Sequence, residues 1–251
     1  MITPSNHNKG YSLSFPRNIF ERRIFCGICG KAMLRTSLRR HSPERAIYCP
    51  TCINEQSSPG YDFRYPLYDL IWEAYRFLRK ERRIALKTAE RIETAYQEGR
   101  ISLVDQFYKN KMEPILEKLQ QNTLKMNQLF MDVPLDEPFP LDAAKSYLNL
   151  QNQATLLTEK LTVPAEALLD FYDAISLNNQ WYRIFSQLPE DFTLTSELSR
   201  RTISTIILTP GQAPKFNVQR QEERERLLNG LNHISKIEQK IARKESYANN
   251  E

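Results

Sequence analysis

The sequence predicts a mostly helical α+β fold: a β-ribbon held together by four cysteines, a long helix, an antiparallel coiled-coil insertion and a late β-hairpin. Three observations support this prediction. The four cysteines form two close pairs near the N-terminus, and much of the remaining chain carries apolar residues at helical spacing. One late segment, residues 201–209, is rich in the β-branched residues that favour strands.

The cysteines have the spacing of a structural metal site. Two residues separate Cys26 from Cys29 and Cys49 from Cys52, and nineteen residues lie between the pairs. Each short pair can direct two thiolates at one ion, and two pairs complete the tetrahedron that Zn²⁺ accepts. We therefore predict a zinc β-ribbon with one structural Zn²⁺ bound by all four cysteines. Two redox-active pairs are the alternative.

The residues around the cysteines predict a short hairpin. Gly27 and Gly30 flank the first pair, where the turn often needs a positive φ or a close approach of the backbone to sulfur. Residues 32–36 and 46–49 are expected to be strands, joined by the polar loop 37–45. Because zinc uses all four cysteines, no thiol remains for nucleophilic catalysis.

Residues 17–45 are strongly basic, with only Glu21 and Glu44 as acidic residues. The basic residues are Arg17, Arg22, Arg23, Lys31, Arg35, Arg39, Arg40 and Arg45. A small metal-stapled hairpin has little core, so most of these side chains are expected to point outward. Clustered arginines match the electrostatic footprint of phosphate binding, and we interpret the cluster as a nucleic-acid surface. A solvated basic face without a partner is the alternative.

Apolar spacing predicts three long helices, at residues 66–98, 101–131 and 141–161. In the first helix Lys80, Arg82 and Arg83 form a second basic cluster, which either continues the DNA surface or is solvated. Three prolines between the second and third helices forbid a continuous helix and suit a reversal. We expect these two helices to form an antiparallel coiled coil, with a compact bundle as the alternative.

The last third of the chain is expected to return to the ribbon. Two shorter helical pieces follow Pro164, and residues 201–209 and 215–219 form a hairpin around a Pro-Gly turn. A charged helix with an apolar stripe ends the chain. The predicted segments are a flexible lead at 1–17, the zinc β-ribbon at 18–60, a connecting helix at 61–100, the coiled-coil hairpin at 101–163, helices and a β-hairpin at 164–219, and the charged C-terminal helix at 220–251.

Composition argues against several classes of protein. The chain has neither the start of a signal peptide nor a long uncharged apolar run, so we expect a cytoplasmic protein without a membrane partner. The net charge of +5 is modest, and its concentration in the ribbon is more informative than its size. The three histidines are scattered, and no carboxylate pair or glycine-rich phosphate loop predicts an enzyme.

Several segments resemble the C-terminal half of the large serine recombinases of phages and mobile elements. The segment NIFERRIFCGICGKAMLR resembles the start of their zinc ribbon, with its first cysteine pair. The segment AIYCPTC resembles the turn that carries the second cysteine pair. The opening of their coiled-coil insertion is similar to EGRISLVDQFYKNKMEPILEKLQQ. Their return to the ribbon domain resembles NNQWYRIFSQLPEDFTLTSELSRRTISTIIL. The resemblance covers residues 18–218, and the ribbon is its most specific part.

The resemblance implies a protein that binds DNA. In that family the zinc ribbon binds one end of the attachment site, and the coiled coil lets DNA-bound subunits touch each other. By matching position, the four cysteines would be the zinc ligands. The hairpin that faces DNA would contain Lys31, Arg35, Arg39, Arg40 and Arg45.

The family's catalytic domain precedes the ribbon, whereas here the similar region already begins near residue 18. Ser12 and Ser14 have no arginines around them that would activate a nucleophile. We therefore expect the chain to cut no DNA unless a separate catalytic subunit acts with it.

The leading hypothesis is a non-catalytic DNA-binding protein that modulates site-specific recombination or DNA integration. Its expected partners are double-stranded DNA and either a serine recombinase chain or a second copy bound through the coiled coil. A split recombinase, an accessory factor, a remnant and a fragment all remain open. The alternative is a zinc-stabilised protein-interaction adaptor, whose DNA binding would be weak and insensitive to salt.

Overall fold

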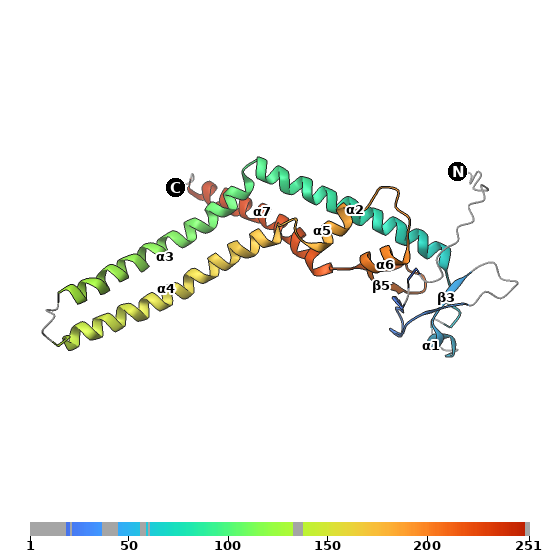
Figure 1. The fold of residues 1–251 in the computed structure, drawn as a ribbon, viewed down its shortest axis with the longest axis horizontal. Helices are drawn as coiled ribbons and strands as arrows, with labels where there is room; N and C mark the ends of the chain where they lie inside the picture. The colour runs from blue at the N-terminus through green and yellow to red at the C-terminus, as the bar shows by residue number, and fades with distance from the viewer. Residues whose placement is uncertain are drawn as a thin grey trace. The chain divides into compact units, whose positions relative to one another are not determined.

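The computed structural model describes residues 19–20, 22–36, 45–55, 59, 61–132 and 138–248. Within these residues the fold is α+β and mostly helical, as the sequence predicts (Figure 1). The elements in chain order are β1 Ile24–Cys26, β2 Leu34–Arg35, β3 Ala46–Tyr48, α1 Pro50–Ile53, β4 Tyr65–Pro66, α2 Leu67–Gln97, α3 Arg100–Met131, α4 Leu141–Ala174, α5 Gln180–Ser186, α6 Ser196–Thr202, β5 Ile203–Leu208, β6 Lys215–Val218 and α7 Gln221–Ala248.

The chain divides into two units, and helix α2 begins in the first and ends in the second. The first unit comprises Met1–Leu86 and Gln180–Gln221, and we call it the ribbon unit. The second comprises Lys87–Asn179 and Glu222–Glu251, and we call it the hairpin unit. Each unit therefore combines segments that are far apart in the sequence.

One sheet of the ribbon unit joins the start of the chain to its later part. Its strand order is β1-β5-β6, with β1 parallel to β5 and β5 antiparallel to β6. Ile24 of β1 pairs with Ile206 of β5. The late hairpin predicted from residues 201–209 and 215–219 is present as β5 and β6. The β-branched side chains of Ile203 and Ile206 are fully buried, which explains why this segment forms a strand.

The second sheet of the ribbon unit has the order β2-β3-β4, and both pairings are antiparallel. The predicted strands at residues 32–36 and 46–49 are both present but shorter. Ala32 forms only an isolated bridge to Phe25, so β2 begins after it. The sequence analysis does not predict β4, because Pro66 weakens the strand signal. An edge strand tolerates proline, since no ladder hydrogen bond needs its nitrogen there.

The core of the ribbon unit includes residues of the first half of α2 and of helix α5. Leu70, Ala74 and Leu78 of α2 are fully buried. Trp181 and Phe185 of α5 are fully buried as well. Burial of large apolar side chains of this kind contributes roughly 1.5–3 kcal/mol each. This core lies outside the cysteine-rich segment and depends on residues from both halves of the chain.

Two further side chains of α2 bind the later part of the chain to this helix. The Phe77 ring stacks on Phe216 of β6, with 4.9 Å between the ring centroids. The Arg82 Nε donates a hydrogen bond to the carbonyl oxygen of Leu188 at 2.7 Å. Arg82 belongs to the second basic cluster of the sequence. Its guanidinium has a structural role, because it is hydrogen-bonded to Leu188.

In the hairpin unit, α3 and α4 run antiparallel and side by side (Figure 1). Their more buried residues recur every three or four positions, as in a coiled coil. On α3 these residues are Tyr108, Met112, Ile115, Leu119, Asn122, Met126 and Leu129; on α4 they are Ala143, Tyr147, Leu150, Ala154, Leu157, Leu161, Pro164, Leu168 and Phe171. The predicted antiparallel coiled coil is confirmed.

Helix α4 corrects one prediction, because it continues through Pro164 to Ala174. The sequence analysis ends the coiled coil at residue 163 and expects two shorter helical pieces after it. Proline inside a helix removes one hydrogen bond and costs about 3 kcal/mol. The seam continues beyond it with Leu168 and Phe171 at the same spacing, and this packing offsets the cost.

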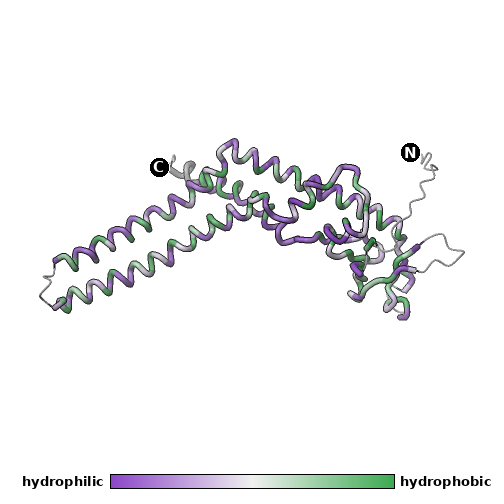
Figure 2. The backbone as a smooth tube through the Cα atoms, viewed as in Figure 1, coloured by the Kyte–Doolittle hydropathy of each residue, from purple (hydrophilic) through white to green (hydrophobic). Residues whose placement is uncertain are grey.

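Helix α7 packs against the rest of the hairpin unit through the predicted apolar stripe. Leu227, Leu231 and Ile234 are all buried. A Cβ atom on Gly230 would lie 2.9 Å from Cγ2 of Ile175, so the helices approach closely at this point. Figure 2 shows apolar and polar residues alternating along these helices. No described helix is both long enough and apolar enough to cross a membrane.

Candidate metal centre

The structure brings the four cysteines together at one point of the ribbon unit. Their four Sγ atoms all lie within 4.8 Å of one another. The Sγ atoms of Cys26 and Cys52 are 3.7 Å apart, and those of Cys29 and Cys49 are 3.4 Å apart. Both of these contacts join one sequence pair to the other. The arrangement is that of four ligands around one metal ion.

The first knuckle is a turn that closes on its own backbone. The Cys26 nitrogen donates to the carbonyl oxygen of Lys31 at 2.9 Å, and the Gly30 nitrogen donates to the Cys26 oxygen at 2.8 Å. Gly30 has a φ of 71°, in the left-handed region that favours glycine. The positive φ predicted for this turn is therefore present at Gly30.

Gly27 serves a different purpose, because it lets the knuckle lie against the end of β5. Its nitrogen donates to the carbonyl oxygen of Leu208 at 2.8 Å. A Cβ atom at this position would lie 2.0 Å from Oγ1 of Thr209. The sequence suggests a close approach to sulfur, whereas the structure shows a close approach to Thr209. The first two ligands are thus held by a strand from the far end of the chain.

The second knuckle is formed by the start of helix α1. Cys49 precedes the helix with an extended backbone, and Pro50 occupies the first turn, where its missing N–H is no loss. The Ile53 nitrogen donates to the Cys49 oxygen at 3.1 Å. One short helical turn therefore carries both Cys49 and Cys52 to the same side of the ribbon.

Burial closes the site on most sides. Cys26 and Cys49 are each 2% exposed and Cys52 is 1% exposed, while Cys29 is half-buried. Burial raises the pKa of Cys49, but hydrogen bonds from the backbone N–H of Cys52 and from neighbouring thiols outweigh it and lower the pKa to about 7. A thiol that ionises near neutral pH is well suited to bind a metal as the thiolate.

The structure places three of the five predicted DNA-contacting residues. Lys31 lies in the first knuckle and is exposed, and Arg35 lies on β2 and is exposed. Arg45 is half-buried and directly precedes β3. Since Thr36 and Ala46 are hydrogen-bonded across the hairpin, Arg35 and Arg45 flank the same end of it. Arg39 and Arg40 lie outside the described residues.

Arg23 belongs to the basic cluster in the sequence but has a structural position. Its Nη1 atom donates to the carbonyl oxygen of Ser199 at 2.8 Å and to that of Ile203 at 3.2 Å. The guanidinium therefore ties the start of β1 to the junction of α6 and β5. Sequence alone does not distinguish this arginine from its exposed neighbours.

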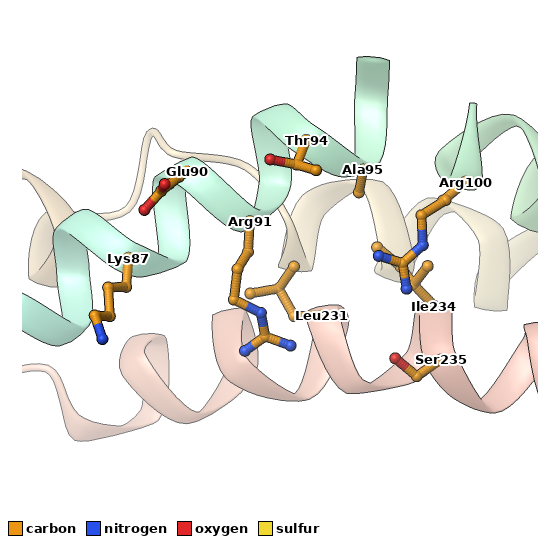
Figure 3. Close-up of a pocket in the computed structure, with 9 residues that line it drawn as sticks. All are labelled: Lys87, Glu90, Arg91, Thr94, Ala95, Arg100, Leu231, Ile234 and Ser235. Carbon is orange, nitrogen blue, oxygen red and sulfur yellow. The ribbon is translucent and has the colours of Figure 1, made fainter. Parts of the chain in front are cut away.

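Among the concave surfaces of the described residues are two that the sequence does not predict. One, in the ribbon unit, is lined by arginines of α5, α6 and the segment after β6. The other, in the hairpin unit, has a volume of about 360 Å³ and lies between α2 and α7 (Figure 3). Arg91 extends across it toward α7. Arg100 also lines this second surface, but its guanidinium is hydrogen-bonded to both carboxylate oxygens of Glu238.

Comparisons of the chain with protein-family models, with curated proteins and with solved structures found no match. Within the described part of the chain, the four cysteines are the one cluster of three or more potential metal ligands.

Proposed function

We propose that the protein is a non-catalytic DNA-binding protein whose basic ribbon is held by a structural Zn²⁺. One observation carries the proposal: four closely spaced thiols staple a small hairpin that exposes Lys31 and Arg35. A ribbon with this composition has a fold that depends on metal and a surface suited to phosphate.

The ligand set supports zinc as the metal. Tetrahedral Zn²⁺ bound at about 2.3 Å by four thiolates separates neighbouring sulfur atoms by about 3.8 Å. The contacts of 3.7 and 3.4 Å between the cysteine pairs approach this value. Because protein ligands would occupy all four positions, the ion would serve the fold and would leave no position for a substrate.

The charge on the ribbon supports nucleic acid as the partner. Lys31, Arg35 and Arg45 carry three positive charges on one small hairpin, and Arg39 and Arg40 add two more in the sequence between them. The guanidinium fork binds phosphate oxygens in pairs, which lysine cannot do. A two-stranded ribbon also fits the major groove of duplex DNA.

The coiled coil supports a partner chain. Several large apolar side chains of α3 and α4 lie outside the seam and are more than half exposed: Leu124, Leu148, Leu156 and Val163. The resemblance of this region to the large serine recombinases suggests the partner. We propose that it is a serine recombinase chain or a second copy, and that these contacts modulate recombination on DNA.

The test of DNA binding is a salt series with zinc-loaded protein and a library of random duplexes. Tight binding that enriches a defined site and falls steeply with salt is expected. Each phosphate contact contributes about 0.9 to the slope of log affinity against log salt. Weak binding without enrichment would favour the alternative, a zinc-stabilised adaptor that uses the coiled coil to bind protein.

A variant with Lys31→Gln, Arg35→Gln and Arg45→Gln locates the surface. We expect its salt slope to decrease by about one to three, because up to three phosphate contacts are lost. The matched control replaces Lys118, Lys125 and Lys160 by glutamine, which removes the same charge from exposed positions on the coiled coil. Equal slopes in the two variants would show that net charge, and not the ribbon, determines binding.

A further inference from the structure

The ribbon unit contains a second basic feature, an open concave surface of about 630 Å³. It is formed by α5, α6 and the end of β6. Four arginines line it: Arg183, Arg200, Arg201 and Arg220. The other lining residues are three glutamines and one isoleucine, so no carboxylate takes part in the lining. We call this surface the arginine concavity.

Three of these arginines have no carboxylate partner among the described residues. Arg183, Arg200 and Arg201 are exposed, and none lies within 4.0 Å of a described acidic oxygen. Because every guanidinium is positively charged, arginine side chains that line one surface repel one another. An anion placed among them would relieve this repulsion and accept several charge-assisted hydrogen bonds.

The backbone that carries these arginines is held firmly in place. On α5, Trp181 and Phe185 are fully buried on the face opposite Arg183. On α6, Ser199 and Thr202 are fully buried, which leaves the next residues in the sequence, Arg200 and Arg201, facing outward. The concavity is therefore a built feature of the fold.

The concavity is also linked to the ribbon. Arg23, just before β1, donates to the carbonyl oxygens of Ser199 and Ile203. The Gln219 nitrogen donates to the Thr202 oxygen at 2.8 Å, which fixes the end of β6 against α6. Arg220 follows with a φ of 60°, a left-handed conformation that is uncommon for a residue with a side chain.

We propose that the arginine concavity binds phosphate groups of the DNA backbone, as a second contact beside that of the ribbon. This inference rests on the proposed DNA-binding function. Guanidinium groups from several directions suit the tetrahedral array of phosphate oxygens, and glutamine amides supply further donors. Contacts of this kind set the position of a protein on the duplex and carry no base sequence.

The test compares three proteins by the salt dependence of binding to one duplex. The pocket variant carries Arg183→Gln, Arg200→Gln and Arg201→Gln, and the control carries glutamine at Lys118, Lys125 and Lys160. For the pocket variant, we expect the slope of log affinity against log salt to decrease in magnitude by about one to three. We also expect it to bind at least tenfold more weakly at low salt. An unchanged melting temperature would confirm that the variant is folded.

The outcomes separate this inference from the function on which it rests. Wild-type protein that binds no DNA would overturn both. DNA binding with the same slope in wild type and pocket variant would overturn the concavity alone. A further variant with lysine at the same three positions retains the charge, so recovery of the slope with incomplete recovery of affinity supports paired contacts from arginine.

Nuclear magnetic resonance of the arginine Nε–Hε groups distinguishes DNA from free phosphate as the source of the anion. The probes are a short duplex and inorganic phosphate. We expect the resonances of Arg183, Arg200 and Arg201 to shift at micromolar duplex, with inorganic phosphate needed at a concentration at least a hundredfold higher. Saturation by phosphate at concentrations below those of the duplex would overturn DNA as the ligand.

Discussion

The ribbon unit and the α3–α4 pair of the hairpin unit are held together by contacts of very different sequence separation. In the ribbon unit, Arg23 is hydrogen-bonded to a residue 180 positions later, and β1 forms a parallel ladder with β5. In the hairpin unit, α3 and α4 follow each other directly and pack through a repeating seam. The first arrangement depends on distant strands beside the cysteine cluster, whereas the α3–α4 pair depends on a local repeat.

This contrast separates two ways of stabilising a small structure. Short strands bury too little apolar surface to hold a ribbon, so covalent or metal cross-links usually supply the missing free energy. In a long helical hairpin, each turn of the helices buries a similar set of apolar side chains and adds a similar small amount to the stability. The two units should consequently respond to different perturbations.

Metal removal should give the largest difference between the units. Structural zinc in small modules binds with an apparent free energy of about 10–16 kcal/mol, most of which is folding free energy. We expect a chelator, or Cys49→Ser, to abolish amide protection in β1, β2 and β3 while α3 and α4 keep theirs. Hydrogen exchange followed by mass spectrometry resolves the two units. Uniform protection before and after chelation would contradict the metal centre, and restoration by added Zn²⁺ is the control.

Substitution of Gly27 should give the next largest effect, again confined to the ribbon unit. Gly27→Ala places a Cβ 2.0 Å from Thr209 Oγ1, and overpacking of this kind costs about 1–3 kcal/mol. Thermal unfolding measures the loss. Thr209→Ala removes the clashing oxygen, so the double variant should recover stability. Equal losses in single and double variants would exclude the clash as the cause.

Gly30 provides a matched comparison, because a Cβ there meets no atom within 4 Å. Replacing Gly30 should therefore cost stability only through its positive φ, and asparagine tolerates that conformation better than alanine does. Gly30→Asn should therefore be less destabilising than Gly30→Ala by several tenths of a kcal/mol. At Gly27, where φ is not positive, asparagine should be the worse of the two because it is larger.

The hairpin unit should be sensitive to a change in its seam. Asn122 is 8% exposed and occupies a seam position of α3 between Leu119 and Met126. A polar residue at such a position fixes register and oligomeric state at a cost in stability. We expect Asn122→Leu to raise the free energy of unfolding by about 1 kcal/mol and to broaden the range of oligomers seen by analytical ultracentrifugation. A destabilised variant with unchanged association would contradict this role.

Lowering the pH should give the smallest change in stability, and this change should arise in the hairpin unit. The hydrogen bond from Arg100 lowers the pKa of Glu238 below its usual 4.5. A carboxyl whose pKa is lower in the folded state stabilises the fold above the unfolded pKa and loses this contribution as pH falls through the folded pKa. The pair is partly exposed, so we expect less than about 1 kcal/mol. Wild type and Glu238→Gln should converge in stability below pH 4.5. A difference that persists in acid would exclude the ion pair as its source.

Local patterns in the sequence predicted the cluster of four cysteines and the long helices well. Cys26, Cys29, Cys49 and Cys52 were identifiable because each short pair is already close to the geometry that a tetrahedral ion requires. The seam of α4 was harder to recognise, because exposed apolar residues such as Leu148 and Leu156 blur the repeat. Pro164 was misread as an end of the helix, since its cost is visible in the sequence and the packing that offsets it is not.

The sequence by itself determined the chemical groups of this protein: four cysteines at metal-binding spacing, a basic ribbon and amphipathic helices. Only the tertiary structure decided which arginines are structural and which face solvent. Arg23 and Arg82 resemble their neighbours in sequence, yet their guanidinium groups bind carbonyl oxygens of the distant residues Ser199 and Leu188. The arginine concavity likewise joins residues of α5, α6 and the end of β6. The charge of an arginine follows from its own side chain. Whether that side chain is free to bind a ligand depends on the carbonyl groups that folding brings next to it from elsewhere in the chain.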